Sequence, residues 1–121
     1  MSFDFNIDTK GEIRVSVMKL GIIFNKKTIN VLGRPEKINI GIDYENKILG
    51  IKSSNGDPYV KEFDFVTKEN QDWIRVATVT IVREIEKITG LKFNNKGFPF
   101  KATFNKELKM LMVDLKGEKN D

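Results

Sequence analysis

The side chains best suited to chemistry in this sequence are cations and aromatic rings, which together can hold a negatively charged ligand. Trp73 and Arg75 stand two residues apart in Trp73–Ala77, whose aromatic and β-branched residues predict a strand. Residues i and i+2 of a strand share a face, so an indole and a guanidinium would lie side by side. Such a pair can stack on a base and bind a phosphate. The alternative is that this tryptophan belongs to the core or to a subunit interface.

Two lysines follow Asn25 at the expected start of a short helix. The free N–H groups and the positive dipole end of a helix favour an anion, and Lys26 and Lys27 would stand beside them. Arg34 lies in the turn Gly33–Pro35, where its planar guanidinium could bind a phosphate or a carboxylate. The alternative is an ordinary helix start and a loop arginine, with all three cations in water.

The segment Phe93–Phe100 interleaves aromatic rings with amides and Lys96. It could line a pocket or form an interface, with Lys96 as its cation. Rings in such a loop also anchor it to the core, and we expect this second role for most of them. The candidate ligand-binding residues are therefore Lys26, Lys27, Arg34, Trp73, Arg75 and Lys96.

Residue types that make and break bonds are scarce. The chain has no cysteine and no histidine, which excludes disulfides, thiolate nucleophiles and serine–histidine pairs. Asp43 and Glu45 are close carboxylates expected in a turn, and Glu62 and Asp64 are close carboxylates expected on the polar face of a strand. The sequence has no glycine-rich phosphate loop and no calcium loop. We predict a protein that is not an enzyme and needs no cofactor or metal.

Length and composition predict one small domain. The chain has 121 residues, of which 40% are hydrophobic, and its formal net charge is +4. This is enough for a core, and it permits an anionic partner. No stretch approaches the ~18 apolar residues of a membrane span. The segment Met1–Asp8 is too polar for a signal peptide. We expect a cytoplasmic protein with no membrane partner.

Hydrophobic periodicity predicts a chain made mostly of hairpins. The expected strands are Glu12–Met18, Gly21–Phe24, Ile38–Ile42, Ile48–Lys52, Tyr59–Val66, Trp73–Ala77, Phe98–Asn105 and Met110–Leu115. A short helix, Lys26–Leu32, should follow Asn25, and one substantial helix should run between Thr78 and Gly90. The predicted class is α+β, a mainly antiparallel sheet of hairpins, in a single domain 1–121 with a frayed tail at 116–121.

The segment Gly21–Gly33, followed by the hairpin Ile38–Lys52, resembles the strand, short helix and hairpin of AbrB-type swapped-hairpin DNA-binding proteins. The resemblance covers about residues 12–53, and a turn of different sequence, Arg34-Pro35-Glu36-Lys37, replaces the Gly-Asp turn usual in that family. It implies a dimer whose basic residues contact DNA. The candidates that it implies are Arg14, Lys26, Lys27 and Arg34.

The whole chain is similar to small uncharacterised proteins carried by phages and prophages of low-GC Gram-positive bacteria. The similarity lies in Phe24–Lys26, Ile48–Lys52, Trp73–Val76, Thr89–Leu91 and the closing segment Met110–Leu115. It implies a viral context, in which small non-enzymatic proteins often counter host defence. They do so by sequestering a nucleotide signal or by blocking an effector in the host cytoplasm.

Three functions are compatible with the sequence. The leading hypothesis is an oligomeric phage or prophage protein that sequesters an anionic, nucleotide-like ligand, with cations on the phosphate and rings on the base. The second is an AbrB-like DNA-binding regulator. The third is an inhibitor that blocks a host protein through an edge strand or an apolar patch.

Overall fold

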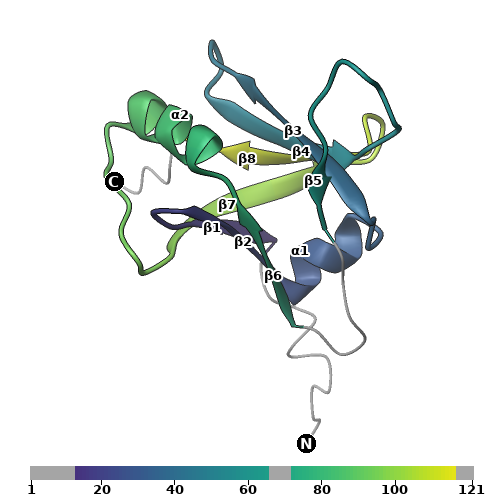
Figure 1. Ribbon diagram of the computed structural model, residues 1–121, viewed down its shortest axis with the longest axis horizontal. Coiled ribbons are helices and arrows are strands. Elements are labelled where there is room, and N and C mark those ends of the chain that lie inside the picture. The colour runs from purple at the N-terminus through teal and green to yellow at the C-terminus, as the bar shows by residue number, and fades with distance from the viewer. Residues whose placement is uncertain (1–12, 66–71, 117–121) are drawn as a thin grey trace, which may run out of the picture.

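The computed structural model describes residues 13–65 and 72–116 (Figure 1). Within these residues the chain forms eight strands and two helices. In chain order they are β1 (Arg14–Val17), β2 (Gly21–Asn25), α1 (Lys26–Val31), β3 (Lys37–Asp43), β4 (Ile48–Ser53), β5 (Phe63–Asp64), β6 (Trp73–Ala77), α2 (Val79–Thr89), β7 (Phe98–Asn105) and β8 (Met110–Asp114).

The strands form one antiparallel sheet in the order β5-β3-β4-β8-β7-β1-β2-β6. The long strand β7 joins two halves of this sheet, because its first half pairs with β1 and its second half pairs with β8. Consecutive strands form the hairpins β1–β2, β3–β4 and β7–β8. The predicted α+β class, a mainly antiparallel sheet of hairpins with one substantial and one short helix, is confirmed.

Alternation along the strands decides which side chains enter the core. In β1, β2 and β6 the inward residues are Val15, Val17, Ile22, Phe24, Ile74 and Val76, and in the other half they include Ile38, Leu49, Ile51, Leu111 and Val113. The two halves meet where the rings of Phe24 and Phe65 pack edge to face, with centroids 5.0 Å apart. The core is therefore enclosed between the halves of a curved sheet.

The short helix α1 begins where β2 ends. The Asn25 side chain accepts a hydrogen bond from the Thr28 N–H at 3.0 Å, as the sequence predicts for this cap. The buried Thr28 hydroxyl accepts from the Arg14 N–H at 3.0 Å and lies 2.9 Å from the Arg14 carbonyl oxygen. The Thr28 hydroxyl therefore bonds the backbone of Arg14 in the way that the backbone of a neighbouring strand would. This contact fixes the start of β1.

The longer helix α2 packs its apolar side on the core and lies well away from α1 (Figure 1). Its N-cap is Thr78, whose hydroxyl accepts from the Ile81 N–H at 3.3 Å, and it ends at Gly90 in the left-handed region at φ 76°. Both ends agree with the sequence expectation. The Tyr44 hydroxyl in the β3–β4 turn donates to the Glu84 carboxylate at 2.9 Å, which ties the turn to the helix.

The predicted strand Tyr59–Val66 is wrong in its extent, because only Phe63–Asp64 forms β5. Tyr59 is 95% exposed, and its N–H is bound by the Asp57 side chain at 2.9 Å. The Val60 N–H likewise donates to the Asp57 carbonyl at 3.2 Å. These local hydrogen bonds fold the first half of the predicted strand into a turn, in place of the hydrogen bonds that a neighbouring strand would provide. Val66 and most of the expected tail, 117–121, lie outside the described residues.

Candidate ligand-binding site

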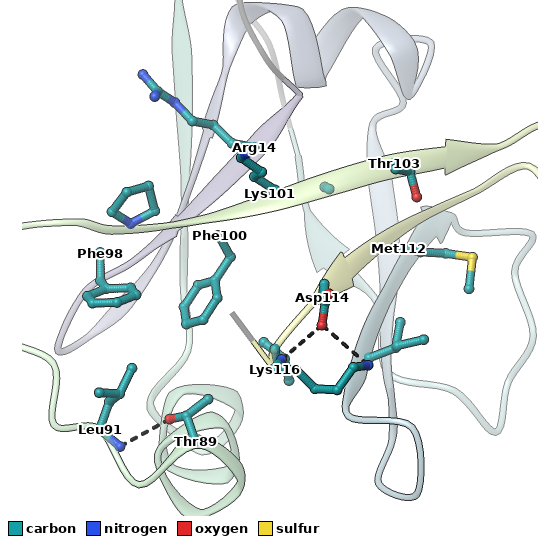
Figure 2. Close-up of a pocket in the computed structure, with 14 residues that line it drawn as sticks. Arg14, Thr89, Leu91, Phe98, Phe100, Lys101, Thr103, Met112, Asp114 and Lys116 are labelled. Carbon is teal, nitrogen blue, oxygen red and sulfur yellow. Dashed lines mark hydrogen bonds and ion pairs between the residues drawn. The ribbon is translucent and has the colours of Figure 1, made fainter. Parts of the chain in front are cut away.

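A cavity of about 750 Å³ opens where β7 parts from β8 (Figure 2). The last pair of this ladder is Ala102 with Val113. Beyond it β7 continues along β1, while β8 continues along β4. The cavity lies between these diverging ends and reaches the segment that follows α2. It is therefore a consequence of one strand, β7, serving both halves of the sheet.

Pro99 contributes to this parting. The Ala102 N–H donates to the Ile13 carbonyl at 3.0 Å, so alternate residues of β7 turn their backbone groups toward β1. By that alternation the nitrogen of Pro99 faces the side of β8, and proline has no N–H to donate there. A β7–β8 ladder continued beyond Ala102 would therefore lack a donor at this residue.

One wall of the cavity is apolar. Phe98 and Phe100 point from β7 toward Leu91 and Thr89, on the side of the strand opposite Lys101 (Figure 2). The two rings have centroids 5.0 Å apart. Phe100 is almost fully buried, whereas Phe98 is 44% exposed. Phe98 therefore offers a ring face to a ligand.

The rim of the cavity carries three cations. Arg14 of β1 lies directly opposite Lys101 of β7, and both side chains are exposed. Lys116 lies across the opening, where its Nζ is 3.4 Å from an Asp114 carboxylate oxygen and donates to the Asn46 carbonyl at 2.8 Å. A bound anion would contact Arg14 and Lys101 together.

Three of the predicted site residues come together at another place, around β6 and the start of α1. Trp73 is 55% exposed and shares the outward face of β6 with Arg75. Lys26 follows Asn25, which lies opposite Trp73, and its Nζ is 3.9 Å from Asp72. The interpretation of Trp73 as a core residue is excluded by its exposure. Its pairing with Arg75 on one face is as the sequence predicts.

The other three predicted residues lie apart from one another. Lys27 is in the first turn of α1, whereas Arg34 follows the end of that helix and donates from Nε to Asn30 at 2.9 Å. Lys96 is in a loop held to the β1–β2 turn by the bond from the Lys19 N–H to the Asn94 carbonyl, 2.8 Å. That turn and the start of α1 are separated by the length of β2, about 14 Å. The structure does not bring all six residues into one site.

The paired carboxylates do not line the cavity, although Asp43 interacts with Lys116 at its rim, and they have local roles. Hydrogen bonds from the side chain and backbone of Asn46 hold the pKa of Asp43 below its ordinary value. Asp64 accepts a hydrogen bond from Lys37 at 2.7 Å and raises the pKa of that lysine. Glu62 is bound by the Ser54 hydroxyl. These contacts agree with the surface interpretation of both pairs.

The cavity residues were largely missed by sequence reasoning. Arg14 was a candidate only through the AbrB resemblance, and Lys101 and Lys116 were not candidates. For the loop that contains Phe98 and Phe100, the sequence predicts that it lines a pocket, forms an interface or anchors itself to the core. Phe98 and Phe100 line the cavity, and the buried Phe93 and Phe100 rings also anchor the loop.

Comparison of the chain with known protein families, curated proteins and solved structures finds no match. None of the helices in the described residues is long and apolar enough to cross a membrane. No group of three acidic side chains that could hold a metal ion occurs in the part of the chain that the structure describes.

Proposed function

We propose that this protein binds a nucleotide-like anion in the cavity and holds it without converting it. The observation that carries the proposal is the cross-strand pair of Arg14 and Lys101 at the rim of a cavity that contains the exposed ring of Phe98. The cations supply charge for phosphate groups, and the ring supplies a stacking surface for a base. The volume, about 750 Å³, lies within the roughly 300–1,000 Å³ of small-molecule sites.

The remaining rim residues would orient the ligand. Thr103 and Asp114 line the opening and offer a hydroxyl and an acceptor for a sugar or for a base edge. Lys116 is a third cation. Its side chain can turn from Asp114 to a phosphate, because the side chains of Lys116 and Asp114 are each about half exposed. These groups bind and orient. They do not form a nucleophile–base pair of the kind that acyl or phosphoryl transfer needs.

Retention without turnover suits a protein that lowers the free concentration of a signal. In the viral context implied by the sequence resemblance, the proposed role is counter-defence: an oligomer that sequesters a nucleotide signal of the host. The cavity would take one ligand per chain. Tight binding lowers the free ligand by mass action alone, so this role needs no catalytic group.

Native mass spectrometry and calorimetry test the proposal on the full chain. Purified protein is titrated with nucleoside monophosphates, triphosphates and cyclic dinucleotides, and any bound ligand is released and weighed. We expect stoichiometric binding of at least one of them, with the ligand recovered unchanged. Arg14→Gln and Lys101→Gln should each weaken binding by roughly tenfold, the worth of a lost charge-assisted hydrogen bond. Lys106→Gln, an exposed lysine of the β7–β8 turn, is the matched control. Absence of binding by the whole set, or equal weakening by the control, would overturn the proposal.

The second candidate function is a DNA-binding regulator. The observation in its favour is the order of β2, α1 and the hairpin β3–β4, which is the strand, short helix and hairpin of the AbrB resemblance. Duplex DNA binding should then weaken steeply with salt. It should also depend on Lys26, Lys27 and Arg34, which lie outside the cavity. Duplex binding with this dependence, and no retention of small nucleotides, would favour the regulator.

A further inference from the structure

The strands β7, β1, β2 and β6 present one continuous outward face. Because Val15, Phe24, Ile74 and Phe100 point into the core, their neighbours along each strand point outward. We call this surface the outer face. It is formed by Pro99, Lys101, Arg14, Ser16, Ile23, Asn25, Trp73 and Arg75. Its β7 end borders the cavity, because Arg14, Pro99 and Lys101 also line that cavity.

The strand registers align the chemistry of the outer face in one row. Lys101 lies opposite Arg14, and the β1–β2 register continues that row toward Asn25, which lies opposite Trp73. Arg75 lies two residues further along β6, on the same face. Lys101 and Trp73 are therefore three strand spacings apart, about 14 Å. The row runs from the cavity to the edge strand of the sheet.

The charge along this row has one sign. The outer face, all of which lies in described strands, holds three cations and no carboxylate. The nearest acid on β6 is Asp72, which precedes the strand and lies 3.9 Å from Lys26. Cations spaced over a sheet surface can contact successive phosphates of a nucleic-acid backbone. We call the line of outer-face cations from Lys101 through Arg14 to Arg75 the track.

An exposed aromatic ring stands near each end of the track, Trp73 on the outer face and Phe98 on the opposite side of β7, inside the cavity. A ligand that reaches both rings passes round β7 where β8 has parted from it. Phe98 is 44% exposed in the cavity, and Trp73 is 55% exposed on the edge strand. One base cannot stack on both rings, because successive stacked bases are only about 3.4 Å apart and the rings belong to strands about 14 Å apart. The arrangement of ring, cations and ring therefore matches two or more bases joined by phosphates.

We infer that the ligand is a single strand of nucleic acid, at least two nucleotides long, which runs from the cavity over Arg14 to Trp73. This inference rests on the proposed function, because it extends the ligand out of the same cavity. Rings that stack on base faces need unpaired bases, which a duplex keeps inside its own stack. The chemistry is common to single-stranded DNA and RNA, so the test includes both.

The experiment uses Trp73 as its own probe, since the chain has one tryptophan. The full-length protein is titrated with thymidine and uridine nucleotides of increasing length, from one to about eight, and both fluorescence and calorimetry are recorded. We expect affinity to rise at least tenfold between the mononucleotide and the tetranucleotide. Only the longer ligands should quench Trp73. The nucleotide series with the higher affinity, thymidine or uridine, shows whether the bound strand is DNA or RNA.

Variants separate the two ends of the track. Trp73→Ala should weaken tetranucleotide binding by roughly tenfold, the worth of one base stacked on an aromatic ring, and leave mononucleotide binding unchanged. Tyr59→Ala, which removes an aromatic side chain that is 95% exposed, is the matched control and should change neither affinity. Arg14→Gln should weaken both ligands.

Two outcomes would overturn the inference. If mononucleotides bind in an Arg14-dependent way but affinity does not rise with length and Trp73 is not quenched, the track is wrong and the cavity proposal stands. If no nucleotide of any length binds, both proposals fail together.

Discussion

Arg14 of β1 and Lys101 of β7 lie opposite each other in an antiparallel ladder, and both residues are exposed at the mouth of the cavity. The buried hydroxyl of Thr28 holds the backbone of Arg14 on its other side. Backbone pairing thus places two cationic side chains opposite each other at the mouth of the cavity. We interpret this pair as two cations that can contact one anion.

The first prediction is that Arg14→Gln separates stability from binding. Because the Arg14 side chain is exposed, its replacement should change the free energy of unfolding by less than about 0.5 kcal/mol. Binding of a nucleotide should weaken in the same variant. Urea denaturation and calorimetry measure the two effects. Arg83→Gln, an exposed arginine of α2, should change neither. A less stable Arg14→Gln protein with unchanged affinity would argue that Arg14 serves the fold.

The second prediction concerns Thr28. Thr28→Val keeps the shape of the side chain but leaves the Arg14 N–H without its 3.0 Å acceptor. A buried donor left unpaired costs about 1–3 kcal/mol, so unfolding should require that much less free energy. Thr80→Val, at an exposed position of α2, is the matched control and should stay within about 0.5 kcal/mol. Equal stabilities for the two variants would show that water satisfies Arg14.

The third prediction concerns the contact that joins the two halves of the sheet. Phe65 is fully buried and packs edge to face on Phe24 at 5.0 Å. Phe65→Ala should lower the free energy of unfolding by about 3–5 kcal/mol, because it leaves a cavity between β2 and β5. Tyr59→Ala should cost less than about 0.5 kcal/mol, since that side chain is 95% exposed. Thermal denaturation followed by circular dichroism compares them, and a small loss at Phe65 would contradict this packing.

The fourth prediction is a pH dependence at the contact between the β3–β4 turn and α2. The hydrogen bond from Tyr44, with a further one from Lys87, holds the pKa of Glu84 below its ordinary value of 4.5. A carboxylate whose pKa is lower in the folded state stabilises the fold above its ordinary pKa. That stabilisation is lost as the pH falls through the folded value.

Tyr44→Phe should therefore raise the pKa of Glu84 toward its ordinary value. It should also reduce stability at neutral pH while leaving acid stability unchanged. Carboxyl carbon shifts in NMR spectra report the titration of Glu84 directly. Tyr59→Phe should leave that titration as it is in the unmodified protein. An identical Glu84 titration in the Tyr44→Phe protein would show that the hydrogen bond is absent in solution.

The elements of this fold follow from local signals. The caps Asn25 and Thr78, the stops Gly33 and Gly90, and the alternating hairpins β3–β4 and β7–β8 are where the pattern predicts them. These features depend on neighbours in the chain, so they can be read from it. The exception is β5, where bonds of Asp57 to its own neighbours replace a strand that the residue types favour.

The site could not be found in the same way, because it depends on contacts between distant segments. Alternation around Val15 turns Arg14 outward, and alternation around Phe100 turns Lys101 outward. Nothing local shows that β1 pairs with β7, which is what brings the two cations together. The pairing of Trp73 with Arg75 could be predicted, because both residues lie on one strand.

The most direct test of the cavity proposal is an NMR titration of the labelled full-length protein with a nucleoside triphosphate, followed by backbone amide shifts. The account predicts saturable shifts at Arg14, at the non-proline residues of Phe98–Thr103 and at Asp114–Lys116, which line the cavity. Shifts confined to the start of α1 around Lys26 and Lys27, or no shifts at all, would contradict it.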